Sequence, residues 1–201
     1  MSADERAWLD LYWLPLGAGG HCVRWNGRAY ERVVAARARR APAPLFHAAL
    51  MLQLDGVTYA VEMGPVWNVA ATDRGVVVEG PVGMRWLGRF RAFRYEVRCW
   101  PGGTIPDLAE AVGGPRRLSA SHAQVSAALD VLPEVPCLTW GRDELGAGEM
   151  WNSNSVVAWV LARTGHDAAE LRPPAAGRAP GWHAGVWLAR QPSGRVGRVT
   201  R

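Results

Sequence analysis

The chain has 201 residues, 49 % of them hydrophobic and 20 % charged, a composition that supports one domain with a buried core and excludes a disordered chain. Its net charge is +5, and all 23 basic residues are arginine, which excludes Schiff-base chemistry and a P-loop lysine. The one dense arginine cluster, Arg37 to Arg40, ends a predicted helix and is interpreted as a solvated helix terminus, so no nucleic-acid partner is expected.

The hydrophobic pattern predicts a mixture of strands and helices within a single domain, 1–201. In chain order the predicted elements are a strand over 8–16, a helix over 27–40, a hairpin over 46–63, a strand at 76–78, a half-buried strand over 92–100, a helix from about 121 to 132 and a helix over 152–164. Beyond Pro173 the chain is rich in proline, glycine and arginine, and an extended or wrapping segment is predicted for 173–201.

The hairpin is the clearest of these elements. Asp55-Gly56 lies between two runs of alternating apolar residues, a strong signal for a two-residue turn, and this turn places Ala49 opposite Glu62. His47 and Glu62 are then diagonal neighbours on the less apolar face, with Cα atoms ~7–8 Å apart. A histidine at a strand start is also common as a packing or surface residue, and the hairpin alone does not decide between these roles.

A second motif is Asn152-Ser153-Asn154-Ser155, at the start of the helix predicted over 152–164. A nucleophile placed there would gain from the positive end of the helix dipole and from unpaired backbone N–H groups, which can also stabilise an oxyanion. Asparagine and serine are equally the favoured helix N-cap residues, so capping alone is an alternative explanation of the motif.

Together the two motifs resemble a known group of enzymes. A strand that begins with histidine, followed far downstream by N-C-N-[ST]-F at a helix start, is typical of the PPPDE peptidases. The pattern is also similar to the N-C-E-H-F motif of the lecithin:retinol acyltransferase and NlpC/P60-like families. His47 matches the histidine of these families, and Ser153 stands where they carry cysteine. Glu62 falls on the strand where the acyltransferase-like members carry the group that orients the histidine.

The resemblance implies a permuted papain-like α+β fold, in which an antiparallel sheet packs against helices over a core of about residues 45–164. It implies acyl-transfer chemistry, as an amide or ester hydrolase or an acyltransferase, with Ser153 as nucleophile and His47 as base. Glu62 would orient the imidazole, and Asn152 or Asn154 would position the helix start or help to bind the oxyanion. The substrate would be a peptide, an amide or an acyl ester, and no cofactor is implied.

Two alternatives remain open at this stage. The same fold could be a catalytically inactive module that binds a peptide or lipid, or the 11 tryptophans could mark a large surface for a partner. The oligomeric state is not indicated by the sequence.

The cysteines and histidines predict no metal site. Cys22, Cys99 and Cys137 are scattered, Cys99 is expected in the core, and the histidines lack the spacing of metal ligands. The scattered cysteines, an N-terminus without a signal-peptide pattern and the lack of an apolar run of ~18 residues predict a cytoplasmic protein with no membrane span.

Overall fold

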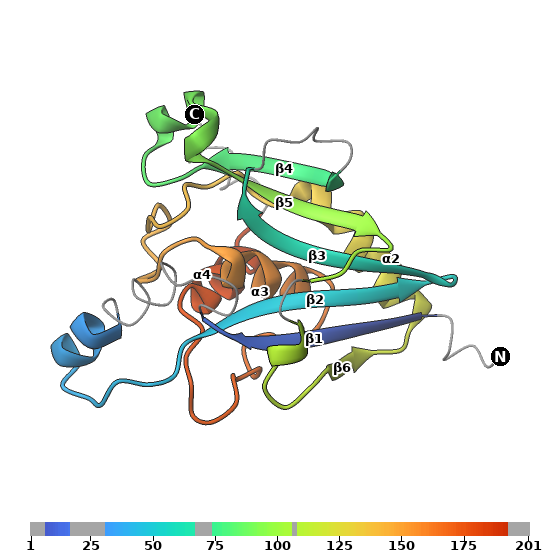
Figure 1. The fold of residues 1–201 in the computed structure, drawn as a ribbon, viewed down its shortest axis with the longest axis horizontal. Coiled ribbons are helices and arrows are strands. Elements are labelled where there is room, and N and C mark those ends of the chain that lie inside the picture. The colour runs from blue at the N-terminus through green and yellow to red at the C-terminus, as the bar shows by residue number, and fades with distance from the viewer. Residues whose placement is uncertain (1–6, 17–30, 67–73, 106–107, 193–201) are drawn as a thin grey trace.

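The computed structural model describes residues 7–16, 31–66, 74–105 and 108–192, and its centre is a six-stranded antiparallel sheet (Figure 1). The strands lie in the order β4-β5-β3-β2-β1-β6. Their bounds are β1 Ala7–Pro15, β2 Phe46–Leu54, β3 Val57–Pro65, β4 Val76–Pro81, β5 Arg94–Pro101 and β6 Arg116–Ser119. The expected α+β class is therefore confirmed.

The predicted hairpin forms with the predicted register. Strands β2 and β3 pair from Leu54 and Val57 at the turn to Leu50 and Val61. Asp55 has φ 50° and Gly56 has φ 83°, the positive values that a two-residue hairpin turn requires.

Beyond Val61, strand β3 keeps β5 as a partner on one edge and is no longer paired with β2 on the other. It pairs with β5 from Tyr59 to Pro65, whereas the paired register with β2 ends at Leu50. The first residues of β2 are thus paired with β1 on one edge. Their other edge is not paired with β3 and can bind other parts of the chain.

Helices α2 (His122–Val131), α3 (Ser153–Arg163) and α4 (Trp182–Ala189) share a hydrophobic core with the sheet. The described part of the chain also contains short 3-10 helices, at η3 Arg85–Arg89, η4 Arg91–Phe93, η5 Leu108–Glu110 and η6 Leu132–Glu134. Helix α3 is apolar nearly all round and is buried from Ser153 to Leu161. Gly165, with φ 83°, follows its last turn, as the sequence predicted.

The structure corrects the expectation for residues 173–201, because part of this segment is a buried helix. Along α4, four apolar side chains are buried in the core: Trp182, Ala184, Val186 and Leu188. Helix α4 packs so closely on α3 that a Cβ added at Gly185 would collide with the carbonyl of Ser155.

Strand β5 also differs from expectation, since both of its faces are buried. A half-buried strand was predicted, with the charged residues on its solvent face, but Glu96 is fully buried and forms an ion pair with Arg74, whose Nε lies 2.9 Å from Oε2. Charged side chains of opposite sign meet on this second face, where Glu96 pairs with Arg74 and Arg98 pairs with Glu62. Alternation alone could not show this.

Two further expectations concern the N-terminal part of the chain. The predicted helix over 27–40 is helical at 31–37, and its first residues lie outside the described part, as does Cys22. In the portions of the chain that the structure describes, every helix is too short or too polar to cross a bilayer.

Candidate active site

His47 and Ser153 lie 106 residues apart in the sequence and are adjacent in the structure. The imidazole Nδ1 of His47 lies 2.7 Å from the Oγ of Ser153. His47 is the second residue of β2 and Ser153 is the first residue of α3, so a strand start and a helix start meet at this point. This is the proximity that the two sequence motifs predicted. Ser153 is 8 % exposed, and His47 is half-buried.

Helix α3 begins with a capping box. The side chain of Asn152 accepts a hydrogen bond from the N–H of Ser155 at 3.2 Å, and the Ser155 hydroxyl accepts one from the N–H of Asn152 at 3.0 Å. The capping explanation is therefore correct for these two residues. It does not account for Ser153, whose side chain faces His47 instead.

Asn154 fixes the helix start to strand β2. Its Oδ1 accepts a hydrogen bond from the N–H of Ala48 at 2.7 Å, and its Nδ2 donates to the carbonyls of Phe46 at 3.0 Å and Pro180 at 3.0 Å. This buried amide thus occupies the edge of β2 from which β3 has separated. Because both amide hydrogens are used, Asn154 positions the site, and its side chain has no donor left for an oxyanion.

A third segment, at the N-terminus of α4, completes the site. The Nδ2 of Asn152 donates to the carbonyl of Pro180 at 2.8 Å, and the Ser155 hydroxyl donates to the carbonyl of Gly181 at 2.7 Å. Sequence reasoning missed these residues. The signal available was Pro180-Gly181 directly before an apolar run, a turn followed by a helix start.

The electrostatics of the pair favour an uncharged histidine. Burial lowers the pKa of His47 to about 4, so the imidazole is neutral at pH 7. With its proton on Nε2, the ring can accept the hydrogen bond of the Ser153 hydroxyl at Nδ1. That is the protonation state in which a histidine can act as a general base.

The helix start also offers hydrogen-bond donors. Ser153 and Asn154 occupy the first two positions of α3, whose N–H groups have no acceptor within the helix. Across the described residues, no other acceptor contacts these two N–H groups. They are therefore available to a negatively charged oxygen beside the Ser153 hydroxyl.

Glu62 contacts an arginine on the neighbouring strand, whereas the sequence predicted that it orients His47. Its carboxylate lies 3.6 Å from the guanidinium of Arg98, the residue directly opposite it on β5. Within the described chain, no hydrogen bond or ion pair joins Glu62 to His47. The physical reason is the separation of β3 from β2, which ends the paired register before Glu62. The structure thus gives no support to Glu62 as the group that orients the imidazole.

The remaining candidate groups are the cysteines and possible metal ligands. Cys99 is half-buried, with its thiol pKa raised to about 11 by burial. Within the described residues, no group of three or more histidine, cysteine or acidic side chains is arranged to hold a metal ion.

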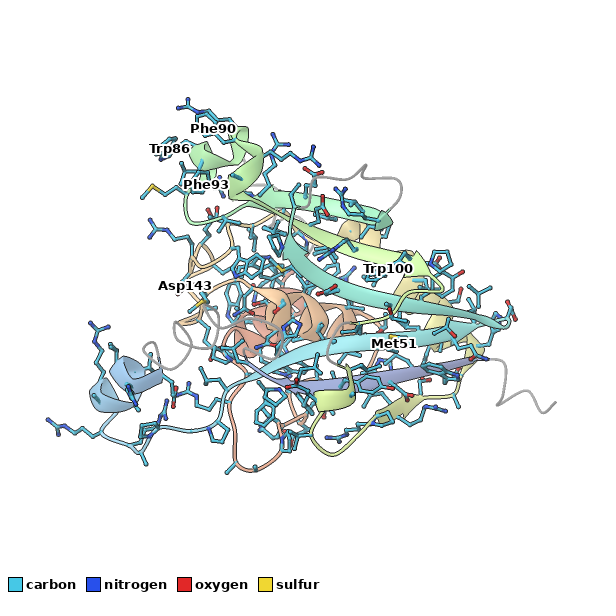
Figure 2. All side chains as sticks on the ribbon, in the orientation of Figure 1. Met51, Trp86, Phe90, Phe93, Trp100 and Asp143 are labelled. Carbon is cyan, nitrogen blue, oxygen red and sulfur yellow. The ribbon has the colours of Figure 1, made fainter. Side chains whose placement is uncertain are left out.

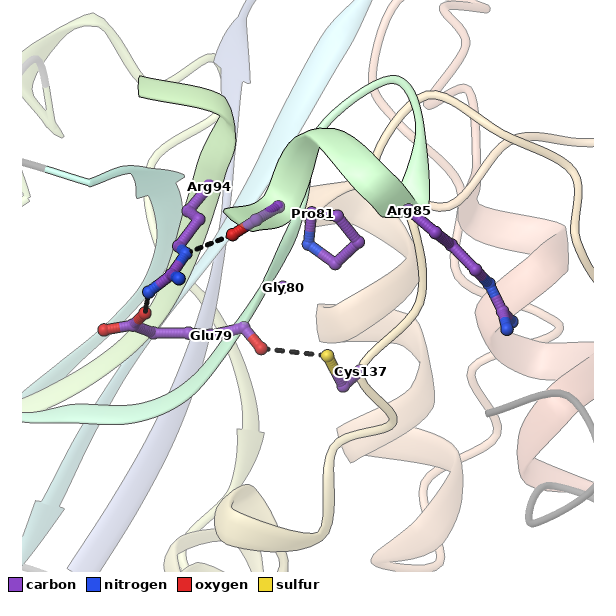
Figure 3. A pocket seen from close by; sticks show the side chains of 7 residues that line it. Glu79, Gly80, Pro81, Arg85, Arg94 and Cys137 are labelled. Atoms are coloured by element: carbon purple, nitrogen blue, oxygen red, sulfur yellow. Dashed lines mark hydrogen bonds and ion pairs between the residues drawn. The ribbon is translucent and has the colours of Figure 1, made fainter. Parts of the chain in front are cut away.

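A pocket of about 350 Å³ lies apart from Ser153 and His47, near the end of β4 (Figure 3). Its lining includes Glu79, Arg85, Arg94 and Cys137. The thiol of Cys137 donates a hydrogen bond to the carbonyl of Glu79 at 2.9 Å, and burial raises its pKa.

Comparison of the chain with protein-family models, with curated proteins and with solved structures found no match.

Proposed function

We propose that the chain is an acyl-transfer enzyme, an amide or ester hydrolase or an acyltransferase, with Ser153 as nucleophile and His47 as general base. The observation that carries the proposal is the 2.7 Å separation of the Ser153 Oγ and the His47 Nδ1 at a helix start. A serine hydroxyl becomes a competent nucleophile when an adjacent base removes its proton, and this geometry supplies that base.

The chemistry follows from this arrangement. As the Ser153 Oγ attacks an acyl carbon, its proton passes to the Nδ1 of His47 and the carbonyl π electrons move to oxygen. When the tetrahedral intermediate collapses, the bond to the leaving amine or alcohol breaks and His47 returns the proton to that group. Water, or an acceptor nucleophile in a transferase, then attacks the acyl-enzyme by the same route, and Ser153 is regenerated.

The oxyanion would be bound at the helix start. The N–H groups of Ser153 and Asn154 lack protein acceptors among the described residues and lie at the positive end of α3. Asn152 and Asn154 act here as positioning residues, because their side chains hold the helix start to Pro180 and to β2.

The proposed fold is a permuted papain-like arrangement in which serine replaces the usual cysteine. Its support is the order of the parts along the chain. A histidine at a strand start precedes a nucleophile at a helix start, and the helix packs against an antiparallel sheet. The substrate would be a peptide, an amide or an acyl ester.

One observation favours the alternative, a binding module that has lost its chemistry. Among the described residues the Nε2 of His47 has no hydrogen-bond partner, and an imidazole with a pKa of about 4 is a weak base. Such a module would keep the fold and bind a peptide or lipid ligand at the same place.

Labelling with a fluorophosphonate probe, followed by mass mapping of the adduct, separates the two. The enzyme predicts an adduct on Ser153 that disappears in Ser153→Ala and becomes much slower in His47→Gln. The matched control is Ser126→Ala, which removes an exposed hydroxyl on α2 and should label as the wild type does. A folded wild type that stays unlabelled would contradict the enzyme and favour the binding module.

A further inference from the structure

A group of large apolar side chains projects into solvent between β4 and β5. Residues 83–94, here called the aromatic tip, contain the short helices η3 and η4. Trp86 is 57 % exposed, Phe90 47 % and Phe93 44 %, and Figure 2 shows all three on the projecting end of the molecule. Scattered exposed apolar residues are ordinary, but three aromatic rings within eight residues form a patch.

The aromatic tip is also strongly basic. It contains four arginines, Arg85, Arg89, Arg91 and Arg94, and no acidic residue. Two of the four pair with acidic residues outside the tip, Arg85 with Glu144 and Arg94 with Glu79. The guanidinium of Arg89 lies over two of the exposed rings, 5.2 Å from the centroid of Trp86 and 4.7 Å from that of Phe90. Positive charge is therefore interleaved with the apolar rings.

The tip is joined firmly to the folded body at its base. The N–H of Val82 donates to the carbonyl of Phe93 at 2.8 Å, and the N–H of Gly83 donates to the carbonyl of Trp140 at 2.9 Å. Trp140 is bridged in turn to Trp151, two residues before Ser153. Backbone hydrogen bonds thus hold the aromatic tip to the rest of the fold, and the exposure of its rings is a feature of the folded structure.

We propose that the aromatic tip docks the protein on an anionic membrane surface. Tryptophan and phenylalanine rings favour the boundary between lipid headgroups and acyl chains, while arginine is attracted by negatively charged headgroups. Insertion of the three rings would remove their apolar surface from water, and Arg89 and Arg91 would lie at the depth of the phosphates. This inference does not depend on the chemistry proposed for Ser153.

A bilayer fits this tip better than a nucleic acid does. Single-stranded nucleic acids bind along a basic groove whose aromatic rings stack on successive bases. Here the rings are on a projecting end, and Met84, 46 % exposed, adds a flexible apolar side chain that cannot stack. Two attractions, apolar insertion and charge, would act together, as stable peripheral attachment requires.

Vesicle co-sedimentation of the full chain tests the proposal. We expect binding to phosphatidylcholine vesicles that contain phosphatidylglycerol, weaker binding as salt is raised, and little binding to phosphatidylcholine alone. Replacing Trp86, Phe90 and Phe93 together by alanine should weaken binding about tenfold or more. The matched control replaces three exposed valines, Val33, Val57 and Val112, by alanine and should bind as the wild type does.

A second pair of variants tests the charge. Arg89→Gln with Arg91→Gln should weaken binding to the anionic vesicles about tenfold, whereas Arg32→Gln with Arg116→Gln removes the same charge elsewhere and should have much less effect. Circular dichroism and the melting temperature establish that each variant is folded. Failure of the wild type to bind anionic vesicles would overturn the proposal, as would equal loss in the tip and control variants. Tip-dependent binding of a single-stranded oligonucleotide without vesicle binding would overturn it in favour of a nucleic acid.

Discussion

The side chain of Asn154 is hydrogen-bonded to strand β2 on both sides of His47. It accepts from the N–H of Ala48 and donates to the carbonyl of Phe46, so the residue after Ser153 fixes the backbone that carries the imidazole. The hydrogen bonds of Asn154 therefore hold Ser153 beside His47, in addition to the direct contact between the two side chains.

Replacement of Asn154 by aspartate should destabilise the protein strongly. A carboxylate cannot donate to the carbonyls of Phe46 and Pro180, and it would be a buried charge facing two carbonyl oxygens. We expect a loss of about 3 kcal/mol in the free energy of unfolding, measured by urea denaturation.

The control for this variant is Asn152→Asp, because aspartate is a good N-cap and keeps the bond to the N–H of Ser155. Its loss should be about 1 kcal/mol, from the bond to the carbonyl of Pro180. Equal losses in both variants would show that the bonds to β2 contribute little.

His47 should make stability depend on pH in a defined window. Its pKa is lowered by burial to about 4, from an ordinary value of 6.5, so between these values the unfolded chain binds a proton that the folded chain does not. The contribution is fully present above pH 6.5 and is lost as pH falls toward 4, with a slope of at most ~1.4 kcal/mol per pH unit.

The measurement is the difference in unfolding free energy between the wild type and His47→Gln across this range. Burial also lowers the pKa of His166, but that residue is present in both proteins and its effect cancels. A pH-independent difference would contradict the lowered pKa of His47.

Ser153→Cys should create a reactive thiol, because it places sulfur beside His47 at the positive end of a helix. Iodoacetamide with peptide mapping should modify this position faster than Cys99 or Cys137, whose pKa values burial raises. Adding His47→Gln should remove most of the advantage. A rate at position 153 no higher than that of Cys99 would contradict a functional contact with His47.

Glu62→Gln should leave the reactivity of Ser153 within about twofold, because the carboxylate contacts Arg98 and lies outside the contacts of His47. Stability should fall by about 1 kcal/mol, since Arg98 is buried and loses a charged partner. Fluorophosphonate labelling and thermal melting report the two effects separately. A large loss of labelling without unfolding would restore Glu62 as the orienting group.

Gly185→Ala should destabilise the packing of α4 on α3, because the added methyl group collides with the carbonyl of Ser155. Backbone cannot move aside as a flexible side chain can, so we expect a loss of about 2 kcal/mol or more. Ala189→Gly, at the C-terminal end of α4, is the comparison, with a cost of at most about 1 kcal/mol from helix propensity. Similar losses in the two variants would contradict a tight crossing at Gly185.

The sequence predicted what local patterns determine. Asp55-Gly56 fixed the register of the hairpin, and the two motifs together predicted that Ser153 and His47 meet. The position of Glu62 depends on a non-local choice, the pairing of β3 with β5, which no alternation within the hairpin reveals.

The other differences between prediction and structure also arise from contacts between residues far apart in the sequence. The burial of Glu96 depends on Arg74, which lies 22 residues away, and the burial of α4 depends on a glycine that admits the backbone of α3. Asn154 was assigned to the site for its place in the motif. Its role in holding β2 became visible only where β3 leaves that strand.

The dependence of the site on Pro180 and Gly181 has a consequence for biosynthesis. A ribosome makes His47 first, Ser153 about a hundred residues later and Gly181 later still. Until Pro180 and Gly181 have emerged, Asn152 and Asn154 lack the carbonyls to which they bond, and helix α4 cannot cover α3. The surroundings of Ser153 are therefore complete only after nearly all of the described chain has been translated. An incomplete nascent chain carries Ser153 without the hydrogen bonds that hold the start of α3 in place.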